Sequence, residues 1–199
     1  AFKSDANPEG KSPVIGMATC FASEKGVEIL LNALPKVLEA DPDAMVLYAG
    51  QYLDVMGEQS YYQRLLPRIQ QYQKEGRWKF LGILNPEEMA PFYANLDVLL
   101  VPSLNSTETF GLVQIEAMMQ GTPTVASNLP GVRVPPRLTD MGLVVPIGDS
   151  EALAKAILKI VSEPESFQGD IPAIKKDFDP LTNAAAYLEL YSELLEELN

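Results

Sequence analysis

The chain has no histidine and very little cysteine. Among its 199 residues there is no histidine, and Cys20 is the one cysteine. The absence of histidine excludes a histidine-dependent catalytic triad, a histidine metal site and the commonest general base at neutral pH. A single cysteine excludes a disulfide framework within the chain and is typical of a reducing compartment. We therefore expect a cytoplasmic protein without a bound metal.

Basic residues and long apolar runs are also scarce. The chain carries 15 Lys and Arg against 27 Asp and Glu, which gives a net charge of −12. Such a charge opposes binding to nucleic-acid phosphates or to an anionic membrane surface. No apolar stretch approaches the roughly 18 residues of a spanning helix, and the N-terminus lacks the apolar run of a signal peptide. We expect no nucleic-acid partner and no transmembrane segment.

What the chain does contain is an alternation of short apolar runs with helical patterns. The length suits one domain with a proper core. Buried strands that alternate with helices predict an α/β fold, in which helices cover both faces of a doubly wound parallel sheet. We expect about six strands, at residues 14–19, 45–50, 78–81, 97–101, 124–126 and 143–145.

The C-terminal part predicts one long loop and one amphipathic helix. Residues 163–179 are rich in proline, glycine and charge, which favours a loop. Residues 181–198 have helical spacing, so we expect a final helix with an apolar face turned inward. The apolar residues on that face are Ala184, Leu188, Tyr191, Leu194, Leu195 and Leu198.

Residues 103–127 contain the most informative local pattern. A strand leads through a polar loop to a helix that carries Glu116, and Glu108 lies shortly before that helix. The start of a helix offers free backbone N–H groups and a partial positive charge to an anion. We expect the N–H groups of Gly111 and Leu112 to face such an anion, with Thr109 as the N-cap.

Other strand ends meet this pattern at the same edge of the predicted sheet. Ligands of open α/β sheets bind beyond the C-terminal ends of the strands. There Lys25 could contact an anion as a point charge, and Glu116 could accept hydrogen bonds from a diol such as ribose. Together they describe a nucleoside diphosphate. The plainer alternatives are that Lys25 forms a solvated pair with Glu24 and that Gly111 only makes a tight turn.

Two well-known phosphate motifs are missing. The Gly-x-Gly-x-x-Gly fingerprint does not follow the first strand, and the chain has no Gly-Lys-Ser/Thr phosphate loop. A dehydrogenase and a phosphate-loop ATPase are therefore poorly supported.

Seven runs of residues, in a fixed order from Pro13 onward, do match a known pattern. In these runs the chain resembles the C-terminal, donor-binding domain of the family 4 retaining glycosyltransferases, or glycosyl transferases group 1, which have the GT-B fold. The glutamate pair with its Phe-Gly is the most specific part. The runs are residues 23–27, 47–50, 80–82, 101–103, 108–118, 121–126 and 142–149.

The resemblance implies a Rossmann-like domain that binds a nucleotide-diphosphate sugar, linked to UDP, GDP or ADP, without a metal or another cofactor. Lys25 and Glu108 would be the catalytic residues, at the diphosphate and at the donor sugar. Glu116 would bind the ribose. The backbone of Phe110, Gly111 and Leu112 would contact the donor, and the main chain near Ile83 and Leu84 would bind the base.

The resemblance also implies a domain organisation. Residues 1–12 would be a linker from a missing N-terminal domain, 13–179 the nucleotide-sugar-binding domain, and 180–199 a helix that packs toward the missing domain. That domain would hold the acceptor, and it could attach a cytoplasmic hexosyltransferase to the periphery of a membrane. The present chain alone would be inactive.

Cys20 departs from the family pattern. The family usually has Arg at this position, five residues before Lys25, where it pairs with the phosphates. A charge-assisted hydrogen bond of that kind contributes roughly 1.5–3 kcal/mol. Either donor binding is weakened, or another cation such as Arg133 compensates. An alternative function is a non-catalytic nucleotide- or sugar-binding module with a decayed diphosphate site, and a further one is a structural domain that shares only the sheet.

Overall fold

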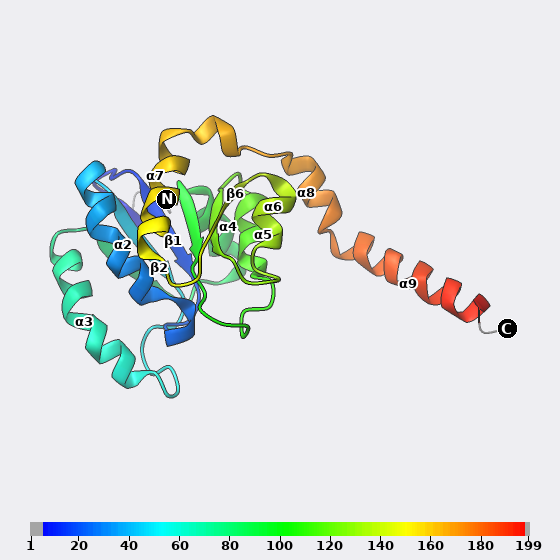
Figure 1. Cartoon of the computed structure of the whole chain (residues 1–199), viewed down its shortest axis with the longest axis horizontal. Coiled ribbons are helices and arrows are strands. Elements are labelled where there is room, and N and C mark those ends of the chain that lie inside the picture. Colours follow the sequence, from blue (N-terminus) through cyan, green and yellow to red (C-terminus); the bar gives the residue numbers. More distant parts are fainter. Residues whose placement is uncertain (1–5, 198–199) are drawn as a thin grey trace.

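A single six-stranded sheet forms the centre of the molecule (Figure 1). The computed structural model of the chain describes residues 6–197. All strands are parallel, and their order is β3-β2-β1-β4-β5-β6. The predicted doubly wound α/β fold is therefore confirmed. The strands are β1 (Val14–Ala18), β2 (Met45–Ala49), β3 (Trp78–Gly82), β4 (Val98–Val101), β5 (Thr124–Ser127) and β6 (Gly142–Val145).

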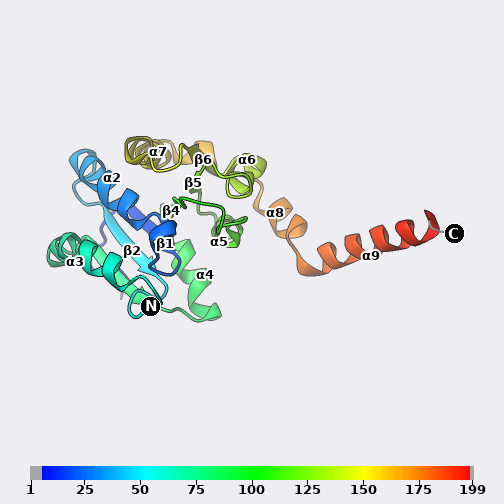
Figure 2. The ribbon, with the colours of Figure 1, turned by 60° about the horizontal axis from the view of Figure 1, so that its bottom comes forward.

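Helices cover both faces of this sheet, as Figure 2 shows. Alternate residues of each strand point to opposite faces, so Ile15 packs with the first set of helices and Val14 with the second. The first set is α2 (Val27–Ala40), α3 (Gln59–Lys74) and α7 (Ser150–Ser162). The second set is α4 (Pro86–Ala94), α5 (Leu112–Met118) and α6 (Val134–Thr139).

The strand order creates a reversal in the middle of the sheet. The chain runs outward from β1 through β2 to β3, and then returns to place β4 on the other side of β1. Ile15 pairs with Val98 and Gly16 with Leu99 across this junction. Ligands of open α/β sheets bind at such a switch point, beyond the carboxyl ends of the strands. The loops after β1 and β4 therefore frame the position where a ligand is expected.

The predicted loop at residues 163–179 is wrong in part. It contains the 3-10 helix η2 (Pro164–Phe167) and the helix α8 (Ile171–Asp177). Proline is well suited to the first turn of a helix, and the Asp170 side chain caps α8 by accepting a hydrogen bond from Ala173 N at 3.0 Å. Ile174 then packs against Ile115 and Met118 of α5.

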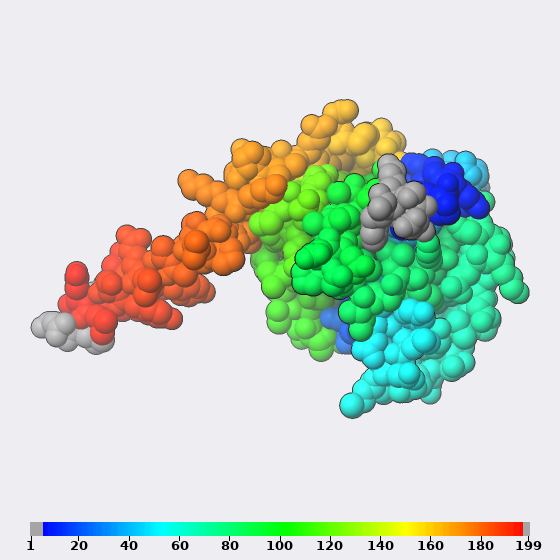
Figure 3. Space-filling model, turned by 180° about the vertical axis from the view of Figure 1, so that it is seen from behind, coloured from blue at the N-terminus to red at the C-terminus, as the bar shows by residue number. Residues whose placement is uncertain are grey.

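The final helix, α9 (Pro180–Glu197), extends away from the body (Figures 1 and 3). Its expected inward face is wrong for the described residues, because Ala184, Leu188, Tyr191, Leu194 and Leu195 are all exposed. Leu198 lies outside the described residues. Among the described residues the helix contacts mainly α8, and its large apolar side chains Leu188 and Tyr191 stay largely exposed.

Part of the predicted linker at residues 1–12 packs on the domain. Residues 1–5 lie outside the described part, but Ala6 and Asn7 are buried, and Ala6 packs with Val14 and Met45. The Asn7 side chain accepts a hydrogen bond from Lys11 N at 2.8 Å and donates one to Lys11 O at 2.7 Å. The role of this segment as a linker stays a prediction.

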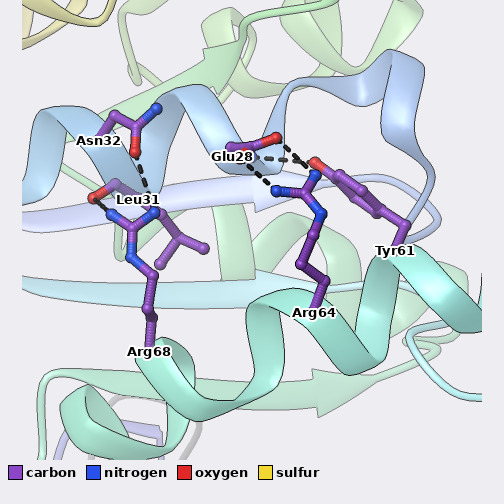
Figure 4. A network of polar contacts seen from close by, with 6 residues as sticks. All are labelled: Glu28, Leu31, Asn32, Tyr61, Arg64 and Arg68. Atoms are coloured by element: carbon purple, nitrogen blue, oxygen red, sulfur yellow. Dashed lines mark hydrogen bonds and ion pairs between the residues drawn. The ribbon is translucent and has the colours of Figure 1, made fainter.

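A polar network joins α3 to the start of α2 (Figure 4). Arg64 donates two hydrogen bonds to the Glu28 carboxylate, at 2.6 and 2.8 Å, and these bonds lower the pKa of Glu28. The Tyr61 hydroxyl accepts a hydrogen bond from Glu28 N at 3.1 Å. Arg68 donates to Asn32 Oδ1 and Leu31 O. The network fixes the first turns of α2, which follow directly after Lys25.

Gly26 allows the start of α2 to lie against the end of β4. Its φ is +73°, and a Cβ there would lie 2.1 Å from Pro102 O. Gly82 has the same φ of +73°, but a Cβ there would meet nothing within 4 Å. Both glycines therefore have a backbone conformation that strains an L-residue, but only Gly26 lies against another segment of backbone.

We expect Gly26→Ala to lower the free energy of unfolding more than Gly82→Ala does. Gly82→Ala should cost about 1–2 kcal/mol, because an L-residue is strained in the left-handed region. Gly26→Ala should cost a further 1–3 kcal/mol or so, because the methyl group meets a carbonyl. Urea unfolding of both variants measures the difference, and equal losses would contradict the close approach.

Candidate active site

Lys25 and Glu108 form an ion pair at the switch point of the sheet. Lys25 ends the 3-10 helix η1 (Ser23–Lys25) after β1, and Glu108 lies in the loop after β4. The Lys25 Nζ atom donates a hydrogen bond to Glu108 Oε2 at 2.9 Å, across 83 residues of sequence. Their side chains are 16% and 22% exposed. The structure thus brings together the two residues predicted to be catalytic, and Lys25 pairs with Glu108 and not with Glu24.

Backbone and side-chain contacts hold the Lys25 turn in place. Leu104 N donates to Glu24 O at 2.8 Å, which ties η1 to the loop after β4. On the other side, the Glu58 carboxylate accepts hydrogen bonds from both Ser23 N and Ser23 Oγ, at 3.0 and 3.1 Å. The ammonium group therefore projects from a turn that is fixed from two directions. Fixed charges of this kind need little reorganisation when a ligand binds.

The start of α5 differs from the prediction. The N-cap is Gly111, with φ +75°, and Thr109 is an exposed loop residue that does not cap the helix. A Cβ on Gly111 would lie 2.9 Å from Gln114 Nε2, so the tight turn needs glycine. The helix has seven residues. Because a helix this short sums few peptide dipoles, the charge of Lys25 matters more for an anion than the helix start does.

The residues beside Gly111 face different surroundings. Leu112 has an exposed side chain, whereas Phe110 is half-buried and its ring centroid lies 6.2 Å from that of Phe178. Their backbone contacts to a donor stay a prediction.

Gln114 was missed by the sequence analysis. It is fully buried, and its Nε2 atom donates to Phe110 O at 3.1 Å and to Val132 O at 3.0 Å. Its Oε1 atom accepts a hydrogen bond from Thr124 Oγ1 at 3.2 Å. One side chain thus joins the loop before α5, strand β5 and the segment before α6. A glutamine within an apolar helix face was the only signal in the sequence, and it did not identify these partners.

Tyr93 was also missed, and it contacts Glu116. The Tyr93 hydroxyl donates a hydrogen bond to Glu116 Oε2 at 2.6 Å. Tyr93 is buried, whereas Glu116 is exposed on the second turn of α5. Burial, and then the hydrogen bond to Glu116, raise the pKa of Tyr93 well above the usual range of tyrosine. The phenol therefore stays protonated as a donor at neutral pH.

Glu116 lines two depressions, one on each side of α5. A pocket of about 370 Å³ lies toward α4, and a groove of about 410 Å³ lies toward α8 and α9. The pocket is lined by Leu84, Pro86, Met89, Ala90, Tyr93, Glu116, Met119 and Gln120. The groove is lined by Leu112, Ile115, Glu116, Met119, Lys175, Phe178, Asp179 and Pro180.

The pocket brings together two more of the predicted site residues. Leu84 and Glu116 share it, whereas the Ile83 side chain is 76% exposed. The roles of Leu84 and Glu116 at a base and a ribose stay predictions. Lys25 and Glu108 line a separate cavity of about 10 Å³ together with Val113 of α5. That cavity is too small to enclose a diphosphate, so a phosphate would contact the pair from its open side.

Comparison with known proteins identifies the family. The family described as "Glycosyl transferases group 1" matches residues 1–173. The chain belongs to this family. Its resemblance to the C-terminal domain of GT-B glycosyltransferases is thereby confirmed over most of its length.

Related proteins show how much of a group 1 glycosyl transferase the chain represents. It is 36% identical over 137 residues to a phosphatidyl-myo-inositol mannosyltransferase of Mycobacterium leprae, covering 69% of this chain and 34% of that protein. It is 30% identical over 174 residues to a D-inositol 3-phosphate glycosyltransferase of Corynebacterium efficiens, covering 85% and 40%. The chain therefore spans well under half the length of these curated relatives.

Two solved structures share this fold. The Anabaena protein HepE, solved in complex with UDP and glucose, superposes with a TM-score of 0.79 at 25% identity, over 96% of this chain and 51% of HepE. The sucrose-phosphate synthase of Thermosynechococcus elongatus gives a TM-score of 0.80 at 28% identity, over 98% of this chain and 49% of the synthase. The chain is thus homologous to domains that bind UDP-sugars.

Cys20 occupies the position where the family resemblance predicts an arginine. The residue follows β1, is half-buried and has a free thiol. It lies near the buried Tyr48 hydroxyl, and burial, followed by the charge interaction with Cys20, raises the pKa of Tyr48. Arg133 lies beyond β5 and donates to Asn128 Oδ1 at 3.2 Å. Compensation for Cys20 by Arg133 stays a prediction.

Residues 6–197 contain neither a candidate metal site nor a candidate membrane-spanning helix. Within that range, no three or more His, Cys, Asp or Glu side chains are grouped so that they could hold a metal ion. None of the helices in the same range combines the length and apolarity needed to cross a membrane.

Proposed function

We propose that the chain is the donor-binding half of a retaining glycosyltransferase of the hexosyltransferase type. It would bind a nucleotide-diphosphate sugar for transfer to an acceptor held by an N-terminal domain. The observation that carries this proposal is the placement of two predicted residue sets at one edge of the sheet. Lys25 pairs with Glu108 at the start of α5, and Glu116 lines a pocket one turn further along the same helix.

Each part of the donor has a matching feature at this edge. The base would lie in the pocket near Leu84 and Pro86, and the ribose hydroxyls would donate to Glu116. The diphosphate would lie along the start of α5 and contact Lys25, while Glu108 would face the sugar. Stabilising negative charge on the departing diphosphate is then the main catalytic contribution of this half. We place the full-length enzyme in the cytoplasm, attached to a membrane surface through the other domain.

Nucleotide binding is the first test. A ligand that binds only the folded state, at a concentration ten times its Kd, raises the free energy of unfolding by roughly 1.4 kcal/mol. We therefore expect UDP, GDP or ADP to raise the Tm by about 3–6 °C. UDP is the first choice, since HepE was solved with it. Glu116→Gln should reduce that shift, because it removes the charge that accepts from the ribose.

The matched control is Glu193→Gln on α9, which removes the same charge from an exposed helix. It should leave the nucleotide shift unchanged. If none of the three nucleotides shifts the Tm at millimolar concentration, donor binding by this chain is wrong.

Cys20 motivates the second candidate, a non-catalytic module with a decayed diphosphate site. We expect Cys20→Arg to tighten UDP binding about tenfold to a hundredfold, because it restores a charge-assisted hydrogen bond of roughly 1.5–3 kcal/mol. Calorimetric titration measures the affinity, and Cys20→Met is the uncharged control of similar length. An unchanged affinity for Cys20→Arg would show that this site does not use the position, and it would remove the reason to call the site decayed.

The exposed face of α9 supports a partner domain in a longer protein. Leu188 and Tyr191 are 67% and 57% exposed, and this 18-residue helix contains no Lys or Arg. The helix carries glutamates beside its apolar residues. An apolar face with an acidic margin fits a surface of the N-terminal domain that is apolar with a basic margin.

The test compares two lengths of the protein. In the present chain, Leu188→Ala and Tyr191→Ala should leave the Tm nearly unchanged, because both side chains are in solvent. In the full-length protein the same substitutions should cost about 2–5 kcal/mol each, as for large side chains buried in a core. Unchanged stability of the full-length variants would contradict the docking role of α9.

A further inference from the structure

Tyr93 is a buried residue whose hydroxyl contacts the exposed carboxylate that we assign to the ribose. This inference rests on the proposed function and deepens it. The 2.6 Å hydrogen bond to Glu116 Oε2 joins α4 to α5 across the pocket of about 370 Å³, and both residues line that pocket. A glutamate on the surface of a helix normally samples several rotamers, which cost free energy to restrict. The bond to Tyr93 removes that freedom for one oxygen.

The Tyr93 side chain is itself held firmly. It is 2% exposed, and its ring centroid lies 5.4 Å from that of Phe92. Its carbonyl accepts a hydrogen bond at 2.6 Å from the hydroxyl of Thr122, which is also buried. The donor hydroxyl is therefore fixed by packing on α4 and by the chain segment that follows α5. A rigid donor can impose one orientation on a mobile carboxylate.

The orientation has a chemical consequence. A carboxylate has about four acceptor sites, and a ribose diol supplies two O–H donors. Because the Tyr93 hydroxyl uses one acceptor site of Oε2 and fixes the carboxylate, both acceptor sites of Glu116 Oε1 remain for the ligand. The acceptor sites of one fixed oxygen suit two adjacent hydroxyls. When a nucleotide lacks those hydroxyls, the partly desolvated charge of Glu116 is left unpaired.

We propose that Tyr93 is a positioning residue that orients Glu116 so that its Oε1 atom accepts the ribose hydroxyls, and that Tyr93 thereby contributes to the selection of ribose over deoxyribose. It does not contact the ribose, and its effect on the ligand passes through Glu116.

The experiment compares Tyr93→Phe with the unchanged protein by calorimetric titration against UDP and 2′,3′-dideoxy-UDP. We expect Tyr93→Phe to weaken UDP binding about tenfold, the size of one hydrogen bond to a charged group. Binding of the dideoxy nucleotide should change less than about twofold, because it has no hydroxyls for Glu116. Tyr187→Phe on the exposed helix α9 removes a hydroxyl elsewhere and should change neither affinity.

A double-mutant cycle separates positioning from a general structural role. In the Glu116→Ala background, Tyr93→Phe should cost no further UDP affinity, because the carboxylate that it orients is gone. Equal losses for UDP and the dideoxy nucleotide, or additive losses in the cycle, would overturn the inference while leaving the proposed function intact.

A measurement without nucleotide tests the pairing itself. The Tyr93 hydroxyl proton, protected by its bond to Glu116, should give an NMR resonance that is lost in Glu116→Ala. Persistence of that resonance in the variant would overturn the inference even if nucleotides bind. If the resonance behaves as expected but UDP, GDP and ADP all fail to bind, the proposed function fails, and the positioning role fails with it.

Discussion

The ion pair between Lys25 and Glu108 depends on the order of the strands, and the arrangement of the site depends on the ion pair. A partly buried ammonium group is costly without a partner, and Lys25 pairs with Glu108, 83 residues away, and not with the adjacent Glu24. Because β4 returns beside β1, the loops after these strands meet and place the two charges 2.9 Å apart. Glu108 lies four residues before α5, and the left-handed Gly111 is the N-cap of that helix. From there the helix direction sets the position of Glu116.

Much of this arrangement could be predicted from the sequence. Short apolar runs between helical patterns predicted the parallel sheet, because strands buried on both faces need apolar residues along their whole length. The rule that ligands bind at strand ends then selected Lys25 and Glu116, and the family resemblance implied the role of Glu108. In the structure Glu116 lies in the pocket with Leu84. Lys25 and Glu108 meet because the loops that contain them follow the neighbouring strands β1 and β4.

Other features depend on contacts that no local pattern contains. Tyr93 looked like one more aromatic residue of an amphipathic helix, because its hydroxyl partner is 23 residues away on α5. The buried amide of Gln114 likewise finds its acceptor in Val132, far along the chain. The apolar face of α9 was recognisable, but periodicity indicates only that a face is apolar and does not say what covers it. The start of α5 at Gly111 was misplaced because a left-handed glycine, and not a side-chain cap, begins the helix.

Glu116 lies between the pocket and the groove, so a ligand in the pocket and a partner in the groove would contact the same side chain. The groove toward α8 and α9 and the pocket toward α4 share the walls formed by Glu116 and Met119. A partner bound to α9 that entered the groove would contact the same carboxylate to which Tyr93 donates from the other side. Linkage is reciprocal, so any factor by which such docking changes nucleotide affinity is the factor by which the nucleotide changes docking. Helix α5 is thus the wall that separates the pocket from the groove, and Glu116 contributes to both.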